Sequence, residues 1–169
     1  MKLNVLLQNE SSRKGLYRGD VLKLLARRVC EGEGVTKNAE LSVLFCDDAR
    51  IQDLNRQYRG KNEPTDVLSF GQLAEVGEAP EEKELVLGDI VISLETVEGR
   101  YRGDRQSMRA EVRLLFCHGL LHLLGYTHQS AAERNAMRAK QAEYLEVGAD
   151  SAWPVCGAPR VRARAHARK

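Results

Sequence analysis

Three of the four histidines of this chain lie in one stretch, residues 117–130, which reads Cys-His-Gly-Leu-Leu-His-Leu-Leu-Gly-Tyr-Thr-His-Gln-Ser. The apolar residues around the first two predict a buried helix, on which His118 and His122 share a face because they are one turn apart. Gly125 can adopt the left-handed conformation that ends a helix, so the reversed chain can bring His128 back toward the other two. Three converging imidazoles are the ligand set of a catalytic zinc site with one position open for water. The sequence therefore predicts a metal site at His118, His122 and His128.

The spacing of this stretch is close to that of the metzincin proteases, whose pattern is His-Glu-x-x-His-x-x-Gly-x-x-His. His122, Gly125 and His128 keep the offsets of that pattern. Gly119 replaces the helical Glu, which is the general base of peptide hydrolysis. The chain therefore has a zincin-like metal helix without the group that would make it a peptidase. A single histidine on an apolar helix is usually a packed core residue, but three at ligand offsets favour a metal site.

Length and charge distribution indicate one domain followed by a basic tail. A chain of 169 residues with 43% apolar content is most simply one globular domain, and we expect it to span residues 1–150. Residues 151–169 are expected to be a disordered tail, since residues 159–169 hold five Lys or Arg and no acid. Residues 13–28 hold six Lys or Arg and one Asp, which predicts either a solvated helix face or a contact surface for phosphates. Residues 71–84 are polar and acidic and are expected to form a surface loop.

The four cysteines, residues 30, 46, 117 and 156, are scattered and include no Cys-x-x-Cys pair, which favours reduced thiols in a cytoplasm or an organelle matrix. Cys117 points about 100° away from His118 around the helix, so we expect a packed thiol and not a ligand. The first apolar run is too short for a signal peptide, and no stretch approaches the ~20 apolar residues of a membrane span.

Periodicity predicts an α+β fold with the metal helix buried in the centre. Strands are expected at residues 3–8, 40–46, 67–70 and 85–93, and helices at 17–30, 47–58, 94–101, 107–124 and 131–147. Asp47 and Asp48 are natural caps for the second helix, and Ser107 for the fourth. Ser130 with Glu133 predicts a capping box that opens the last helix, with Gly148 as its stop. The expected inner faces are residues 21, 24, 25, 28 and 29 in the first helix, and residues 51, 54 and 58 in the second.

The histidine stretch resembles the signature of the YbeY family, the metal-dependent endoribonucleases also called ribosomal RNA maturation factors. Three other stretches are similar to family blocks and occur in the family order. They are Asn55-Arg-Gln-Tyr-Arg59 followed by Gly-Lys, Pro64-Thr-Asp-Val-Leu-Ser-Phe70, and Gly88-Asp-Ile-Val-Ile-Ser93. Two positions depart from the family pattern: Thr127 stands where Asp is usual, and Gly71 where Pro is common. Any acid or base role of that Asp is absent here.

The resemblance implies a small mixed β-sheet flanked by helices in a single domain. It implies one Zn²⁺ ion held by His118, His122 and His128, with Arg59 as a catalytic residue. The implied activity is cleavage of single-stranded RNA in ribosomal RNA processing and ribosome quality control. Ribosomal small-subunit proteins and a ribosome-associated GTPase are the implied partners, and the cytoplasm the implied compartment.

Several alternatives stay open at the level of sequence. Attack on the phosphodiester by water and attack by the 2′-hydroxyl of the substrate are both compatible with the motif. The chain could instead hydrolyse another class of substrate, or serve as a ribosome assembly factor with a structural zinc. Aromatic content is only 5%, so RNA binding is expected to depend on Lys and Arg, including those of the basic tail.

Overall fold

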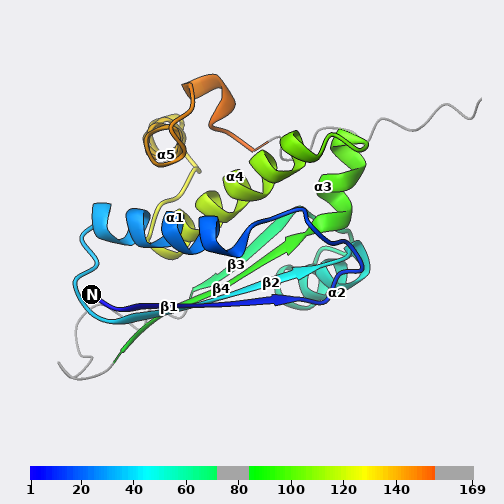
Figure 1. Ribbon diagram of the computed structural model, residues 1–169, viewed down its shortest axis with the longest axis horizontal. Helices are drawn as coiled ribbons and strands as arrows, with labels where there is room; N and C mark the ends of the chain where they lie inside the picture. Colours follow the sequence, from blue (N-terminus) through cyan, green and yellow to red (C-terminus); the bar gives the residue numbers. More distant parts are fainter. Residues whose placement is uncertain (72–83, 155–169) are drawn as a thin grey trace, which may run out of the picture.

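The computed structural model describes residues 1–71 and 84–154, and its framework is a four-stranded mixed sheet (Figure 1). The strand order is β1-β2-β4-β3, with β1, β2 and β4 parallel and β3 antiparallel to β4 at one edge. The strands are β1 (Leu3–Asn9), β2 (Ala39–Cys46), β3 (Val67–Gly71) and β4 (Leu85–Ser93). All four predicted strands are confirmed, and so is the mixed sheet.

Helices cover both faces of this sheet, and α4 is the central one. Figure 1 shows α1 and α4 running across one face, with α5 outside them and α2 on the opposite face. The helix bounds are α1 (Gly19–Gly32), α2 (Asp48–Arg59), α3 (Leu94–Tyr101), α4 (Arg105–Leu123) and α5 (Ala131–Leu145), followed by a 3-10 turn, η1 (Ala149–Ser151). α4 contacts β3, β4, α1, α3 and α5, which explains why its residues after Arg113 are apolar nearly all round.

The apolar core is strongly asymmetric about the sheet. Ile90 and Ile92 of β4 point toward the large cluster under α1 and α4, whereas Val91 between them points toward a small cluster under α2. The small cluster consists of Cys46, Ile51, Leu68 and Val91. Most of the buried apolar surface therefore holds α4 in place, and α2 is attached more lightly.

Two predicted inner faces are partly wrong. The buried residues of α1 are Leu22, Leu25, Ala26, Val29 and Cys30, whereas Leu24 is 69% exposed. The buried face is rotated from the predicted one because α1 packs against both β1 and α4. In α2, Ile51 is buried as predicted, but Tyr58 is 61% exposed because it lies beyond the small cluster, at the helix end.

Two helix ends also differ from prediction. Asp104, and not Ser107, caps α4: its carboxylate accepts hydrogen bonds from the backbone of Gln106 and Ser107, and the Ser107 hydroxyl donates to it as well. α5 ends at Leu145, before Gly148, because Glu146 itself adopts the left-handed conformation. The capping box of Ser130 and Glu133 is confirmed.

The acidic stretch and most of the basic tail fall on residues 72–83 and 155–169, which lie outside the described residues. The division of the chain at residue 150 stays a prediction. Ala152 and Pro154, just beyond it, are buried. In the described part of the chain, no helix is both long and apolar enough to cross a lipid bilayer.

Candidate metal centre

The three predicted ligands come together at the end of α4. His118 and His122 lie one turn apart on the helix, and His128 comes from the segment before α5. Their candidate ligand atoms all lie within 4.8 Å of one another. His118 is buried, His122 half-buried and His128 exposed, so the cluster opens to solvent on the His128 side.

The turn after α4 brings His128 back, as the glycine predicts. Gly125 has a φ of +98°, and its backbone N–H donates to the carbonyl of His122 at 3.0 Å. The N–H of Tyr126 donates to the carbonyl of Leu121, also at 3.0 Å. This pair of bonds is a Schellman motif, which reverses the chain at a residue without a Cβ. The capping box at Ser130 then starts α5, so His128 is fixed from both sides.

Each buried imidazole is oriented by a hydrogen bond to its far nitrogen. His118 Nδ1 lies 2.8 Å from Gln141 Oε1, and His122 Nδ1 lies 2.8 Å from the carbonyl oxygen of Tyr126. The amide nitrogen of Gln141 donates to the carbonyl of Ala152, so its oxygen must face His118. Both Nδ1 atoms therefore carry the proton, and both Nε2 atoms keep their lone pairs.

His122 Nε2 lies 3.0 Å from His118 Nε2, and with both protons on Nδ1 neither of these nitrogens can donate to the other. Such a pair of acceptors repels unless a cation lies nearby. In a tetrahedral site with Zn–N bonds of about 2.1 Å, neighbouring nitrogens lie about 3.4 Å apart, a few tenths of an ångström from this separation. The donor set and its spacing therefore fit a transition-metal ion.

Burial keeps both helical imidazoles neutral, which is the form that binds a metal. Burial, with a smaller contribution from His122, lowers the pKa of His118 to about 4 despite the hydrogen bond to Gln141. Burial also lowers the pKa of His122, and the positive charge of Arg59 adds to this effect. At neutral pH no proton therefore has to be displaced from these two ligands.

The half-buried carboxylate of Glu33 holds the Tyr126 end of the site. The Tyr126 hydroxyl donates to Glu33 at 2.8 Å, and the Tyr144 hydroxyl and the Lys140 ammonium contact the same carboxylate. Burial alone would raise the pKa of Glu33, but these three donors lower it, so the carboxylate is ionised at neutral pH. Glu33 thereby holds Tyr126, whose backbone carbonyl orients His122.

Gly119, which stands where a peptidase carries its catalytic Glu, lies in close contact with the sheet. A Cβ at this position would lie 3.0 Å from Ile90 Cγ2 and 3.0 Å from the Ser69 hydroxyl oxygen. The helical turn between His118 and His122 thus packs directly on β3 and β4. A larger residue at position 119 would make these two side chains shift by a few tenths of an ångström.

Arg59 is the last residue of α2, which lies on the face of the sheet opposite α4, and its side chain is exposed. Its charge acts on His122, so the guanidinium lies within electrostatic reach of the cluster. Within residues 1–71 and 84–154 it makes no hydrogen bond or ion pair. It is therefore available to an anionic substrate.

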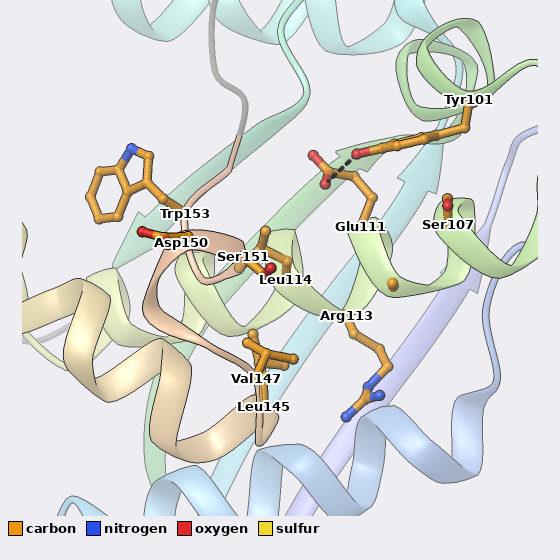
Figure 2. Close-up of a pocket in the computed structure, with 11 residues that line it drawn as sticks. Tyr101, Ser107, Glu111, Arg113, Leu114, Leu145, Val147, Asp150, Ser151 and Trp153 are labelled. Atoms are coloured by element: carbon orange, nitrogen blue, oxygen red, sulfur yellow. Dashed lines mark hydrogen bonds between the residues drawn. The ribbon is translucent and has the colours of Figure 1, made fainter.

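An ionic cluster around Glu111, two turns before His118 on α4, was not predicted from the sequence. Arg100 donates to Asp66 at 2.7 Å and to Glu111 at 2.8 Å, and both carboxylates are almost fully buried. The Tyr101 hydroxyl also donates to Glu111, at the wall of a cavity of about 300 Å³ (Figure 2). Burial raises the pKa of Glu111 despite the hydrogen bond from Tyr101 and the charge of Arg100. The cluster joins α3, α4 and the start of β3.

Two contacts of the metal centre were also missed. Gln141 is fully buried, and only its position on the inner face of α5, beside Met137 and Tyr144, hinted at a role. The Trp153 ring lies 5.4 Å from the ring of His118 and 5.6 Å from that of His128. Cys117 is a buried thiol whose pKa burial raises to about 12, as expected of a packed residue.

Comparison with known proteins agrees with this geometry. The model of the family described as endoribonuclease YbeY matches residues 7–148. The chain is 47% identical over 125 residues to the endoribonuclease YbeY of Pelotomaculum thermopropionicum, covering 74% of this chain and 82% of that protein. It is 37% identical over 153 residues to the endoribonuclease YbeY of a Thermoanaerobacter species, covering 85% and 96% of the two chains.

A solved structure is similar as well. The solution structure of the Thermotoga maritima protein TM1509 superposes with a TM-score of 0.56 at 26% identity, covering 84% of this chain and 87% of that one. The family match begins within β1 and includes the other three strands, α4 and all three histidines. This chain belongs to the YbeY endoribonuclease family.

Proposed function

We propose that this protein is a zinc-dependent endoribonuclease that cleaves single-stranded RNA in ribosomal RNA maturation and quality control. The single observation that carries the proposal is the convergence of His118, His122 and His128, whose candidate ligand atoms lie within 4.8 Å of one another, in a chain of an endoribonuclease family. His118, His122 and His128 would hold one Zn²⁺ ion.

A zinc ion bound by three imidazoles supplies an electrophile for a phosphoryl oxygen and lowers the pKa of water toward neutrality. The surrounding residues of the chain set the tautomers of the ligands and the approach of the substrate. Gln141 and the Tyr126 carbonyl keep the protons of His118 and His122 on Nδ1, so the metal-facing nitrogens stay free. The exposed side of His128 gives the substrate an open approach.

Arg59 is proposed as the catalytic residue that binds the reacting phosphate. Negative charge grows on the phosphoryl oxygens during cleavage, and a guanidinium offers two parallel donors that stay charged at any working pH. Its exposure, its lack of a partner among the described residues and its field at His122 support this role. No carboxylate from the histidine stretch faces the cluster as a general base, since Gly119 and Thr127 occupy the two positions where motifs of this kind carry acids.

The test combines elemental analysis of the native protein with an RNA cleavage assay on native, chelated and metal-restored samples. Zinc near one equivalent, loss of cleavage on chelation and recovery with zinc are expected. Recovery with another metal only would change the proposed cofactor, since imidazoles also accept nickel and copper. A 2′,3′-cyclic phosphate on the product would identify the 2′-hydroxyl as the nucleophile.

Two rival functions are separated by the same samples. Chelator-sensitive cleavage of casein and not of RNA would indicate a hydrolase of another class, which the crowding at Gly119 argues against. A metal with four protein ligands would indicate a structural site in an assembly factor. We further infer ribosomal small-subunit proteins and a ribosome-associated GTPase as partners, and a cytoplasmic location, from the family alone.

A further inference from the structure

A row of three arginines runs along α4 on the side opposite the imidazoles. Arg105, Arg109 and Arg113 follow one another at intervals of one turn, and Arg109 is rotated by about 180° from His118 around the helix axis. With α1 and the residues before it, this arginine row lines a groove of about 630 Å³. Figure 2 shows Arg113 pointing from α4 toward the blue helix α1, away from Glu111.

The arginine row is not neutralised by the protein. Within residues 1–71 and 84–154, none of the three guanidinium groups forms an ion pair. Arg109 donates to the carbonyl of Gly15 at 3.0 Å, and the Nε of Arg113 is buried without a hydrogen-bond partner. No acidic side chain is among the described residues that line the groove. A fourth arginine in the groove, Arg18, is paired with Asp20, and both are well exposed.

The geometry points to a surface for a phosphate chain. Successive members of the row rise by about 6 Å along the axis, close to the spacing of phosphates in an extended strand. Guanidinium groups bind phosphate oxygens through two parallel donors, and no carboxylate competes for those of the row among the described residues that line the groove. An acidic protein surface carries no such regular one-dimensional spacing of charge, so a single nucleic-acid strand is the better fit.

We propose that the arginine row binds the phosphate backbone of RNA at a site separate from the catalytic centre. The inference rests on the proposed function for the identity of the nucleic acid. Because α4 lies between the row and the imidazoles, the row would add affinity without touching the reacting phosphate. Of the basic residues 13–28, which the sequence offered as a phosphate surface, only Arg18, just before α1, lines this groove.

The experiment compares salt dependence in metal-loaded protein. The test variant is R105Q/R109Q/R113Q, and R105K/R109K/R113K keeps the charges. The matched control, K23Q/R27Q/R28Q, removes the same charge from the exposed face of α1. The probe is a short, labelled, single-stranded oligodeoxynucleotide, because phosphate contacts do not require the 2′-hydroxyl and the binding readout is then independent of RNA cleavage.

Binding to single strands weakens with salt by about 0.7 logarithmic units per phosphate contact, so loss of three contacts should reduce the slope by about 2. Affinity at low salt should fall by about tenfold or more, with the Lys variant near wild type. With RNA as substrate, KM should rise while kcat stays unchanged.

The inference would be overturned if the Gln variant melted normally and its binding affinity still depended on salt with the wild-type slope. If the α1 control lost salt dependence instead, the strand would bind the exposed face of α1, and the inference would be overturned as well. If an acidic peptide but no oligonucleotide bound in a row-dependent way, the surface would be a protein-docking site. Failure of the wild type to cleave RNA would count against the proposed function, while the salt slope would still report on the row.

Discussion

Two clusters on α4, two helical turns apart, hold their buried polar groups in different ways. At the C-terminal end, His118 and His122 are neutral, and each is oriented by a neutral acceptor, the Gln141 amide or the Tyr126 carbonyl. Two turns earlier, Glu111 is held by a formal charge, the Arg100 guanidinium, which also binds Asp66. In the ionic cluster both carboxylates pair with Arg100, whereas in the imidazole cluster two Nε2 acceptors lie 3.0 Å apart. The first arrangement is a cross-link between elements, and the second is a receptor for a cation.

The largest effect should come from removing a ligand. His118→Ala or His122→Ala should lose both metal and metal-dependent RNA cleavage, because two imidazoles cannot replace three. Metal content and cleavage rate are the measurements, with circular dichroism to verify the fold. Cleavage at the normal rate by either variant would show that the metal centre is assigned to the wrong residues.

The next effect should be on stability and should come from the ionic cluster of Arg100, Asp66 and Glu111. Arg100→Met removes the guanidinium that pairs with two buried carboxylates and should lower the free energy of unfolding by about 3–5 kcal/mol, measured in urea. The loss should grow as pH rises, because the pKa of Glu111 in the folded protein is already raised and would rise further without Arg100. Below the unfolded-state pKa the carboxyl is protonated in both states, so the loss should shrink there.

Glu111→Gln is the control for this comparison, since it removes one of the two acids and keeps the Arg100–Asp66 pair. We expect a clearly smaller loss than in Arg100→Met. Equal losses that do not depend on pH would mean that packing, and not charge, dominates the cluster.

Arg59→Glu should lower kcat by about 10²–10³-fold, the usual cost of losing a donor to the developing charge. Metal content and unfolding free energy should stay unchanged, because Arg59 is exposed and lies outside both clusters of α4. Arg56→Glu, with the same charge change three residues earlier on α2, is the matched control. Loss of metal in the Arg59 variant would make this residue structural and refute the catalytic assignment.

The smallest effect should come from Gln141→Leu, which removes the acceptor for His118 Nδ1 and leaves all three ligands in place. Zinc affinity should fall by about 10–100-fold, measured by competition with a chelator. Met137→Leu, one turn earlier on the buried face of α5, should leave affinity unchanged. Equal affinity in wild type and Gln141→Leu would show that packing alone orients the imidazole.

The parts predicted from sequence are those set by local rules. The spacing of His118 and His122, the turn at Gly125 and the capping box at Ser130 all depend on residues within one or two helical turns. The missed parts depend on contacts between distant segments: Gln141 meets His118 across 23 positions, and Arg100 meets Asp66 across 34. The exposed Tyr58 was misplaced for the same reason, because only the packed sheet shows where the small cluster ends.

The close contact of Gly119 with β3 and β4 ties the metal centre to the sheet. A Cβ at position 119 would lie 3.0 Å from side-chain atoms of Ile90 and Ser69, so any larger residue there requires these neighbours to give way. Because His118 and His122 lie on either side of this position on α4, the packing of β3 and β4 helps to set where the two helical imidazoles stand.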